Sequence, residues 1–317
     1  MKHTAGLGFL FALTTAVLWG AVPLAMTPLV AHIDAVTISW FRFAVAGVVL
    51  GAFFAASGRL YRLRFDWRTV AWPFGIAVLG LVGNSLFYVQ SLHYITAPVA
   101  QVVVQVAPVL LMLGSLWLFG ERFGALQWGG FALLLAGITI FCFDRLRIAG
   151  TGAEVFGVGV VLMVVAALAW AAYGLAQKRL LQYLAPQAVL MGIYLAGALL
   201  LLPASSPGVV ATLGRGELAL LGFLALNTLV GYGSFAEALK CWDASRVGAV
   251  LALQPVVTLA GAVAGTQLLP AWFASSSLTT TAVVSCLAVV AGSAICALGG
   301  NAHASVRRRL EPAAGGG

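Results

Sequence analysis

Charged residues are scarce in this chain. Of its 317 residues only 8% are charged, whereas 62% are hydrophobic. Soluble domains carry about 25% charged residues. A chain with so little charge cannot cover itself with polar surface. The composition therefore excludes an ordinary water-soluble domain and predicts that lipid is the solvent of the protein.

Sequence motifs of enzymes are also missing. The chain contains no HExxH zinc motif, no GxSxG nucleophile motif and no Walker loop, and its four histidines are scattered. We therefore expect no enzymatic activity, no catalytic residue, no metal site and no cofactor. Because nothing in the sequence supplies an ATP-binding domain, we expect any transport to be driven by a gradient of a solute or an ion.

Cysteines are few and are not spaced for disulfide bonds. Cys142 and Cys241 are expected on opposite sides of the membrane. Cys286 and Cys296 are expected on a single helix, roughly 15 Å apart along its axis. Because the Cα atoms of a disulfide lie within about 7 Å of each other, we expect all four cysteines to be unpaired.

Long hydrophobic runs are what the sequence has in abundance. Hydrocarbon about 30 Å thick requires roughly 20 apolar residues for each helical crossing. We therefore expect an all-α membrane protein with ten transmembrane helices, the first of which is not a cleavable signal peptide. The predicted crossings cover residues 5–29, 35–57, 69–92, 97–119, 125–143, 155–177, 186–205, 217–239, 246–269 and 277–299.

The distribution of basic residues predicts the orientation in the membrane. If the N-terminus is cytoplasmic, the outer loops hold only three of the 17 Lys and Arg residues, and Arg42 falls within a helix. All the others fall on the cytoplasmic side, which is the positive-inside bias and places both termini in the cytoplasm. Orientation then explains the net charge of +8 without a nucleic-acid partner. The three outer residues are Arg145, Arg147 and Arg215.

The two halves of the chain resemble each other. The segment AVLWGA at 16–21 matches ALAWAA at 167–172, and a second alignment places Pro108 on Pro255. With five crossings in each half, the second copy starts on the opposite side of the membrane. We therefore expect two inverted five-helix repeats with a binding site at mid-depth between them. The predicted repeats are residues 1–147 and 152–299, followed by a disordered cytoplasmic tail at 300–317.

The sequence also resembles a known family over residues 5–299. The segments that carry the resemblance are AVLWGAVP in the first helix, WFRF at 40–43, APV…VAPVLLMLGSLWLFGERF at 97–123 and NTLVGYGSFAEALKCWDASRVGAVLALQP at 227–255. Together they resemble EamA-type members of the drug/metabolite transporter superfamily. The resemblance implies a ten-helix, inverted-repeat transporter of the bacterial inner membrane. Such proteins often export amino acids or other small metabolites.

Acidic residues are absent at two informative places. Members of this family often carry an acidic turn after the fourth helix of both halves. Glu121 supplies the first turn, whereas the equivalent stretch at 266–270 reads TQLLP, without a carboxylate. The first predicted helix contains no Asp or Glu either, which counts against a small-multidrug-type exchange of protons for a cation.

Glutamines beside prolines mark the candidate site. A buried amide without a hydrogen-bond partner costs about a few kcal/mol, and lipid offers no such partner. Gln101 and Gln105 share one helix face, so that face should point towards protein or water. We expect these two and Gln254 to line a substrate cavity, and Pro108 and Pro255 to break their helices at matching depth. The alternative is that the prolines only bend packed helices and the glutamines only bridge neighbours.

Aromatic residues in mid-helix are further candidates. Trp19 and Trp170 occupy equivalent positions in the two halves, at a depth where an interfacial belt cannot explain them. We predict that they line the cavity, with Tyr88 and Tyr173 nearby, although plain packing is equally compatible with the pattern. Asn84 shares a polar helix stripe with Tyr88 and joins the candidate binding residues.

Charges inside the predicted helices complete the candidate set. Arg42 either snorkels to the outer interface, about 10 Å away, or binds a substrate carboxylate, and snorkelling is favoured. Glu237 lies three residues before Lys240, at the spacing of a helical salt bridge. We take these three residues as candidates for a gate or for coupling, with a structural pair favoured over a proton relay.

Secondary transport is the function expected from these patterns. The expected substrates are small organic metabolites, amino acids in particular and among them aromatic or apolar ones. They would cross the inner membrane by alternating access in the direction of efflux. The alternatives are a multidrug or other metabolite permease of the same superfamily, and a channel or assembly protein. The sequence leaves open the substrate, the direction, the coupling ion, the missing acidic turn, and the choice between monomer and homodimer.

Overall fold

The structure of the protein is a computed structural model that describes residues 2–58, 67–119, 124–241, 244–268 and 279–310. Within these ranges every regular element is helical. The α-helices are α1 (Lys2–Leu29), α2 (Ala35–Ala56), α3 (Trp67–Ser91), α4 (Ala97–Val103), α5 (Val106–Phe119), α6 (Ala125–Ala149), α7 (Ala153–Leu180), α8 (Pro186–Leu201), α9 (Arg215–Cys241), α10 (Ala244–Leu251), α11 (Gln254–Leu268) and α12 (Thr280–Leu310). Short 3-10 helices are η2 (Gly150–Gly152), η3 (Leu202–Ala204) and η4 (Pro207–Thr212).

The predicted crossings agree with the helices in position, but two of them are interrupted. The segment predicted at 97–119 is divided into α4 and α5, and the segment predicted at 246–269 into α10 and α11. α12 continues to Leu310, into the segment for which the sequence predicts disorder. In the described ranges, seven helices are long and apolar enough to cross a membrane.

Both interruptions are made by tightened turns. Pro108 has no N–H, so the carbonyl of Val104 cannot receive its usual donor four residues on. The N–H of Ala107 donates to that carbonyl instead, at 2.8 Å. At the second interruption the N–H of Leu253 donates to the carbonyl of Val250, at 3.1 Å. Bonds over three residues thus satisfy backbone groups that a regular helix would pair over four.

Apolar side chains cover the outward faces of the bundle. Val48, Leu199 and Val284, on three different helices, are 63%, 70% and 60% exposed. Exposed apolar surface of this extent is unfavourable in water, whereas acyl chains accept it. The outer surface therefore suits a lipid environment, as the composition predicts.

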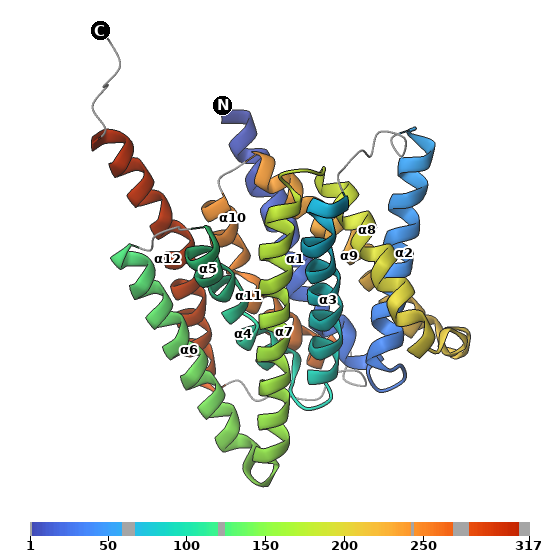
Figure 1. Cartoon of the computed structure of the whole chain (residues 1–317). Helices are drawn as coiled ribbons and strands as arrows, with labels where there is room; N and C mark the ends of the chain where they lie inside the picture. Colours follow the sequence, from blue (N-terminus) through green and yellow to red (C-terminus); the bar gives the residue numbers. More distant parts are fainter. Residues whose placement is uncertain (1, 59–66, 120–123, 242–243, 269–278, 311–317) are drawn as a thin grey trace.

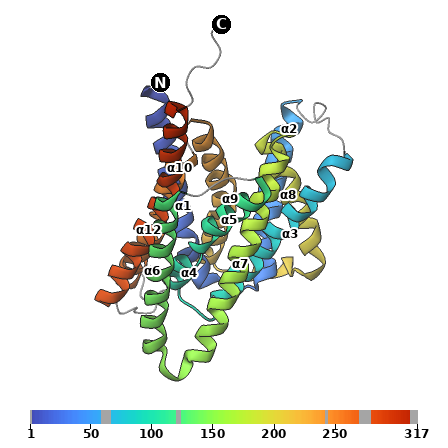
Figure 2. The same cartoon turned by 60° about the vertical axis from the view of Figure 1, so that its left-hand side comes forward.

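Long helices pack in pairs that join the two halves of the chain. α1 packs against α9, α2 against α8, α3 against α7, and α6 against α12; α6 and α12 lie side by side in both views (Figures 1 and 2). Glycines allow the close approach of α6 and α12. A Cβ atom on Gly130 would lie 2.7 Å from the backbone nitrogen of Cys296, and one on Gly292 would lie 2.5 Å from that of Leu134.

A hydrophobic cluster closes one end of the bundle. We call the buried residues around Leu29, Ile33, Ile95, Val99 and Leu221 the distal cluster, and each of these five is at most 6% exposed. The start of α1 and the end of α12 lie at the opposite end, which is at the top in both views (Figures 1 and 2). The distal cluster therefore seals the end that is remote from the two ends of the chain.

Candidate functional site

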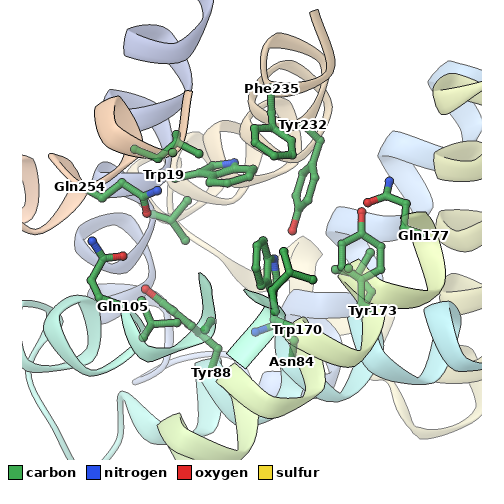
Figure 3. A pocket seen from close by; sticks show the side chains of 18 of the residues that line it. Trp19, Asn84, Tyr88, Gln105, Trp170, Tyr173, Gln177, Tyr232, Phe235 and Gln254 are labelled. Carbon is green, nitrogen blue, oxygen red and sulfur yellow. The ribbon is translucent and has the colours of Figure 1, made fainter. Parts of the chain in front are cut away.

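A large cavity lies among the helices of the described structure. Its volume is about 720 Å³, which is enough for a small organic molecule. Its lining comes from both halves of the chain and includes α1, α3, α4, α7, α9 and α11 (Figure 3). The lining runs from buried Met26 and Gln101 to exposed Lys178 and Leu181 at the end of α7. The cavity therefore reaches the surface away from the distal cluster.

The cavity brings together the residues that the sequence predicts for substrate binding. They come from α1, α3, α4, α7, α11 and the turn between α4 and α5, and all of them line it. The residues are Trp19, Asn84, Tyr88, Gln101, Gln105, Trp170, Tyr173 and Gln254. Pro255 is buried beside Gln254 at the start of α11, whereas the side chain of Pro108 lies outside the described residues. The binding role of these side chains stays a prediction.

Tyr88, Gln101 and Gln254 form a hydrogen-bonded chain along the cavity wall. The hydroxyl of Tyr88 donates to Oε1 of Gln101 at 3.1 Å, and Nε2 of Gln101 donates to Oε1 of Gln254 at 2.8 Å. Gln101 and Gln254 are 2% and 9% exposed. Because buried amides need hydrogen-bond partners, this chain holds α3, α4 and α11 together where the two interrupted segments meet.

Gln105 contributes an unused hydrogen-bond donor. Its Nε2 atom is buried and has no hydrogen-bond partner within the described structure, and the side chain as a whole is 3% exposed. Figure 3 places it in the cavity wall below Gln254. A buried donor without a partner costs about 1–3 kcal/mol. The amide of Gln105 is therefore available to an acceptor on a bound solute.

Aromatic rings form much of the cavity wall. The ring of Trp19 lies 5.0 Å from that of Tyr232 and 5.4 Å from that of Phe235, measured between ring centres. Trp170 and Tyr173, 6.5 Å apart, face them from α7 (Figure 3). Tilted ring contacts at these distances are favourable and leave apolar ring surface towards the cavity. This wall suits flat or apolar groups of a solute.

Arg42 lies inside the bundle, so the interpretation that it snorkels to the outer interface is wrong. It is 9% exposed, and its Nε donates to Oγ1 of Thr228 on α9 at 3.0 Å. The physical reason is that α2 packs against α9 as well as α8, which turns this face inward. Asp34, on the same helix face, instead accepts from the N–H and hydroxyl of Thr37 as a helix cap.

Two asparagines make corresponding contacts in the two halves. Nδ2 of Asn84 on α3 donates to the carbonyl of Ala166 on α7 at 3.0 Å. Nδ2 of Asn227 on α9 donates to the carbonyl of Leu18 on α1 at 2.6 Å. Each amide ties a third long helix of one half to the first helix of the other. Asn84 therefore has a structural bond in addition to its place in the cavity wall.

The candidate gate at the end of α9 is described only in part. Glu237 is half-buried there. The side chain of Lys240 lies outside the described residues, and so does the whole of Glu121 in the acidic turn. A pair between Glu237 and Lys240 stays a prediction, as does any role of that turn.

The sequence does not single out three residues that line the cavity, namely Tyr232, Phe235 and Gln177, or Thr228, which binds Arg42. Gln177 follows Trp170 by two helical turns, so the helical period alone could have placed it on the same face. Thr228 could not be found in this way. Its contact with Arg42 joins residues that are 186 positions apart in the chain.

The side chains of the described cavity wall can form hydrogen bonds, ring contacts and charge interactions with a solute. No three His, Cys, Asp or Glu side chains among them gather into a site for a metal ion. All four cysteines are free, which confirms the prediction from their spacing. The described lining combines amides, aromatic rings and the cations Arg42 and Lys178.

Comparison with known proteins finds relatives along nearly the whole chain. The model of the EamA-like transporter family matches residues 6–143 and again residues 157–298. An uncharacterized inner membrane transporter of Escherichia coli, YhbE, is 37% identical over 310 residues, which cover 97% of this chain and 96% of the relative. The aromatic amino acid exporter YddG of Ancylobacter novellus is 28% identical over 293 residues, with 91% and 96% covered.

The fold is shared with a solved protein as well. A crystal structure aligns with a TM-score of 0.61 at 22% identity, covering 91% of this chain and 96% of the solved one. The family and the names of the relatives indicate a membrane transporter rather than an enzyme. The paired helices, the central cavity and the double family match agree with the motifs in the sequence: this chain belongs to the EamA-like transporter family of the drug/metabolite transporter superfamily.

Proposed function

We propose that the protein is a secondary transporter that moves small organic metabolites, amino acids in particular, out of the cell across the bacterial inner membrane. The observation that carries the proposal is the form of the cavity. Both halves line it, it reaches the surface at one end, and the distal cluster seals the other end. A carrier that works by alternating access presents its site to one side of the membrane at a time.

The pattern of helix contacts supports two inverted repeats of five crossings, residues 1–147 and 152–299. In the two repeats α1 corresponds to α7, α3 to α9 and α5 to α11. The contact of α1 with α9 then corresponds to that of α7 with α3, and the contact of α1 with α11 corresponds to that of α7 with α5. The hydrogen bonds of Asn84 and Asn227 follow the same exchange. Each interrupted segment then counts as one crossing, and the total is ten.

The distribution of charge supports efflux as the direction. The cavity reaches the surface at the end of α7, and the basic residues Lys178 and Arg179 lie in the last turn of that helix. The positive-inside rule assigns this end to the cytoplasm. A cavity open on that side would load its solute from inside the cell.

The lining supports amino acids with apolar or aromatic side chains as the substrates. Trp19 and Tyr232 supply apolar ring surface, and Gln105 supplies a free donor. A relative that is 28% identical over 293 residues is named as an aromatic amino acid exporter. A permease for other apolar metabolites is the second candidate, favoured by the same ring surface. The sealed distal end argues against a channel, which needs a continuous pathway.

Transport by the purified protein in lipid vesicles tests the proposal. Vesicles loaded with unlabelled phenylalanine or leucine are diluted into the labelled amino acid, and its uptake is followed. We expect saturable counterflow above that of protein-free vesicles. Uptake that rises linearly with concentration would indicate a channel. The absence of counterflow for amino acids and for a panel of apolar metabolites would contradict a carrier.

A further inference from the structure

The charge in the cavity wall is of one sign. The charged residues in the described lining are Arg42 and Lys178, and it contains no carboxylate. Lys178 lies at the exposed end of the cavity, whereas Arg42 is buried. The buried part of the described wall therefore carries a single positive charge.

Arg42 is held in place by a hydrogen bond to the hydroxyl of Thr228, which uses one of its N–H donors. The hydroxyl of Thr228 donates to the carbonyl of Leu224 at 2.9 Å and accepts from Nε of Arg42 at 3.0 Å. This leaves four of the five guanidinium N–H groups without a bond to that hydroxyl. No carboxylate of the described residues forms an ion pair with Arg42.

A buried guanidinium without a counter-ion is an unstable arrangement. Removing a charge from water is unfavourable unless an opposite charge offsets the lost hydration. The planar guanidinium fork matches the two oxygens of a carboxylate, with two parallel hydrogen bonds. A carboxylate brought in by a solute would supply what the protein itself does not.

The surroundings of Arg42 define the remainder of the solute. Tyr232 lies one helical turn after Thr228 on α9, and its ring contacts that of Trp19. Gln105 adds a free amide donor in the same cavity. An apolar or aromatic group attached to a carboxylate would lie against these rings, and no acidic side chain of the described wall would bind an ammonium group.

We propose that Arg42, positioned by Thr228, is the carboxylate-binding subsite of this cavity, and that the substrate class is monocarboxylates with an apolar or aromatic group. The ammonium group of an amino acid is not needed for recognition. Deaminated acids therefore bind as amino acids do, whereas the decarboxylated amines are repelled by Arg42. The claim that these solutes are carried rests on the proposed transport function, but the claim that they bind does not.

Binding to the purified full-length protein in lipid nanodiscs tests the subsite. The probes are phenylalanine, 3-phenylpropionate and phenethylamine, which share a ring and differ only in their charged groups. Each is titrated while the fluorescence of the protein is followed, because Trp19 and Trp170 line the cavity. We expect the two carboxylates to bind within tenfold of each other and the amine at least tenfold more weakly.

Variants separate the role of Arg42 from a general effect of charge. Arg42→Gln should weaken both carboxylates at least tenfold and leave phenethylamine unchanged or better bound. Arg42→Lys keeps the charge but lacks the planar fork. Its affinity for the two carboxylates should lie between those of the unaltered protein and Arg42→Gln. Arg179→Gln removes an exposed cation outside the described lining and should bind like the unaltered protein.

The outcomes distinguish the subsite from the transport function. Equal binding of amine and carboxylates, carboxylate binding that survives in Arg42→Gln, or no carboxylate binding overturns the subsite. Should Arg42→Gln not fold, Arg42→Lys still tests the subsite, because binding of both carboxylates as tight as in the unaltered protein would overturn it. Binding that depends on the carboxylate without counterflow in vesicles would leave the subsite standing and remove the transport proposal. Counterflow of phenethylamine at the rate of phenylalanine would leave the transport proposal standing and overturn the carboxylate subsite.

Discussion

Gln101 and Gln254 are bonded directly to each other, with Nε2 of Gln101 donating to Oε1 of Gln254 at 2.8 Å. They are 153 positions apart in the chain. Gln101 belongs to the short helix α4, and Gln254 begins α11, so the bond ties together the two interrupted segments. Because both side chains are buried, neither amide can replace this bond with one to water, and lipid offers no hydrogen-bond partner.

Removing one member of this pair should destabilise the protein. Gln101→Leu leaves the hydroxyl of Tyr88 and Oε1 of Gln254 without their partner, and we expect a loss of about 1–3 kcal/mol in the free energy of unfolding. Gln101→Leu with Gln254→Leu should cost less than the sum of the single variants, because the second change removes an orphaned group. Denaturant unfolding in detergent measures the cycle. Gln182→Leu, at an exposed site, is the control; strictly additive losses would contradict the coupling.

Trp19→Ala and Trp170→Ala should each slow transport about tenfold, the equivalent of roughly 1.4 kcal/mol of lost solute contact. The rates are measured by counterflow at matched amounts of protein in the vesicles. Trp72→Ala is the matched control, because Trp72 is 78% exposed on the outer surface. Unchanged rates in both cavity variants would mean that these rings only pack against their neighbours.

The contact between α6 and α12 should be sensitive to one methyl group. Gly130→Ala places a Cβ atom 2.7 Å from the backbone nitrogen of Cys296 and 2.8 Å from the carbonyl of Gly292. Backbone cannot move aside as a side chain can, so we expect a loss of about 1–3 kcal/mol in stability. Thermal unfolding in detergent gives the measurement. The neighbouring Gly129→Ala meets nothing within 4 Å and should unfold at the same temperature as the unaltered protein or slightly above it.

The two ends of the chain should lie in the cytoplasm. Fusions of green fluorescent protein to either end should fluoresce in intact bacteria, and fusions of alkaline phosphatase to either end should be inactive. A phosphatase fusion within η4, which joins α8 to α9 at the other end of the bundle, should be active and serves as the control. Active phosphatase at one end of the chain only would exclude two inverted repeats of five crossings.

Hydropathy predicts the helices well because lipid imposes a length and a composition on every crossing. It predicts the interruptions less well. Pro108 and Pro255 mark both places, but a proline can also bend a helix that continues. Whether the helix bends or is interrupted depends on local hydrogen bonds, such as the one from the N–H of Ala107 to the carbonyl of Val104. The composition of the segment does not reveal these bonds.

The candidate site was predictable where a helical period or an internal repeat points to it. Trp19 and Trp170 match between the halves, and Gln101 and Gln105 share one face, and all four line the cavity. The prediction that Arg42 snorkels was wrong because it used only the distance from Arg42 to the interface along its own helix. The burial of Arg42 comes from the packing of α2 against α9, which that distance does not include. Contacts between distant segments decide such cases, and a single sequence does not contain them.

The distal cluster has a consequence for the effect of temperature on the proposed cycle. Turning the cavity towards the outside requires side chains such as Leu29, Ile95 and Val99 to separate and become hydrated. Hydration of apolar groups is opposed mainly by the entropy of water near room temperature, and this opposition weakens on cooling. Cold should therefore favour the outward-facing arrangement, and warmth the one described here. A protein that carries this cluster would have a thermal bias in the side it presents, independent of any solute.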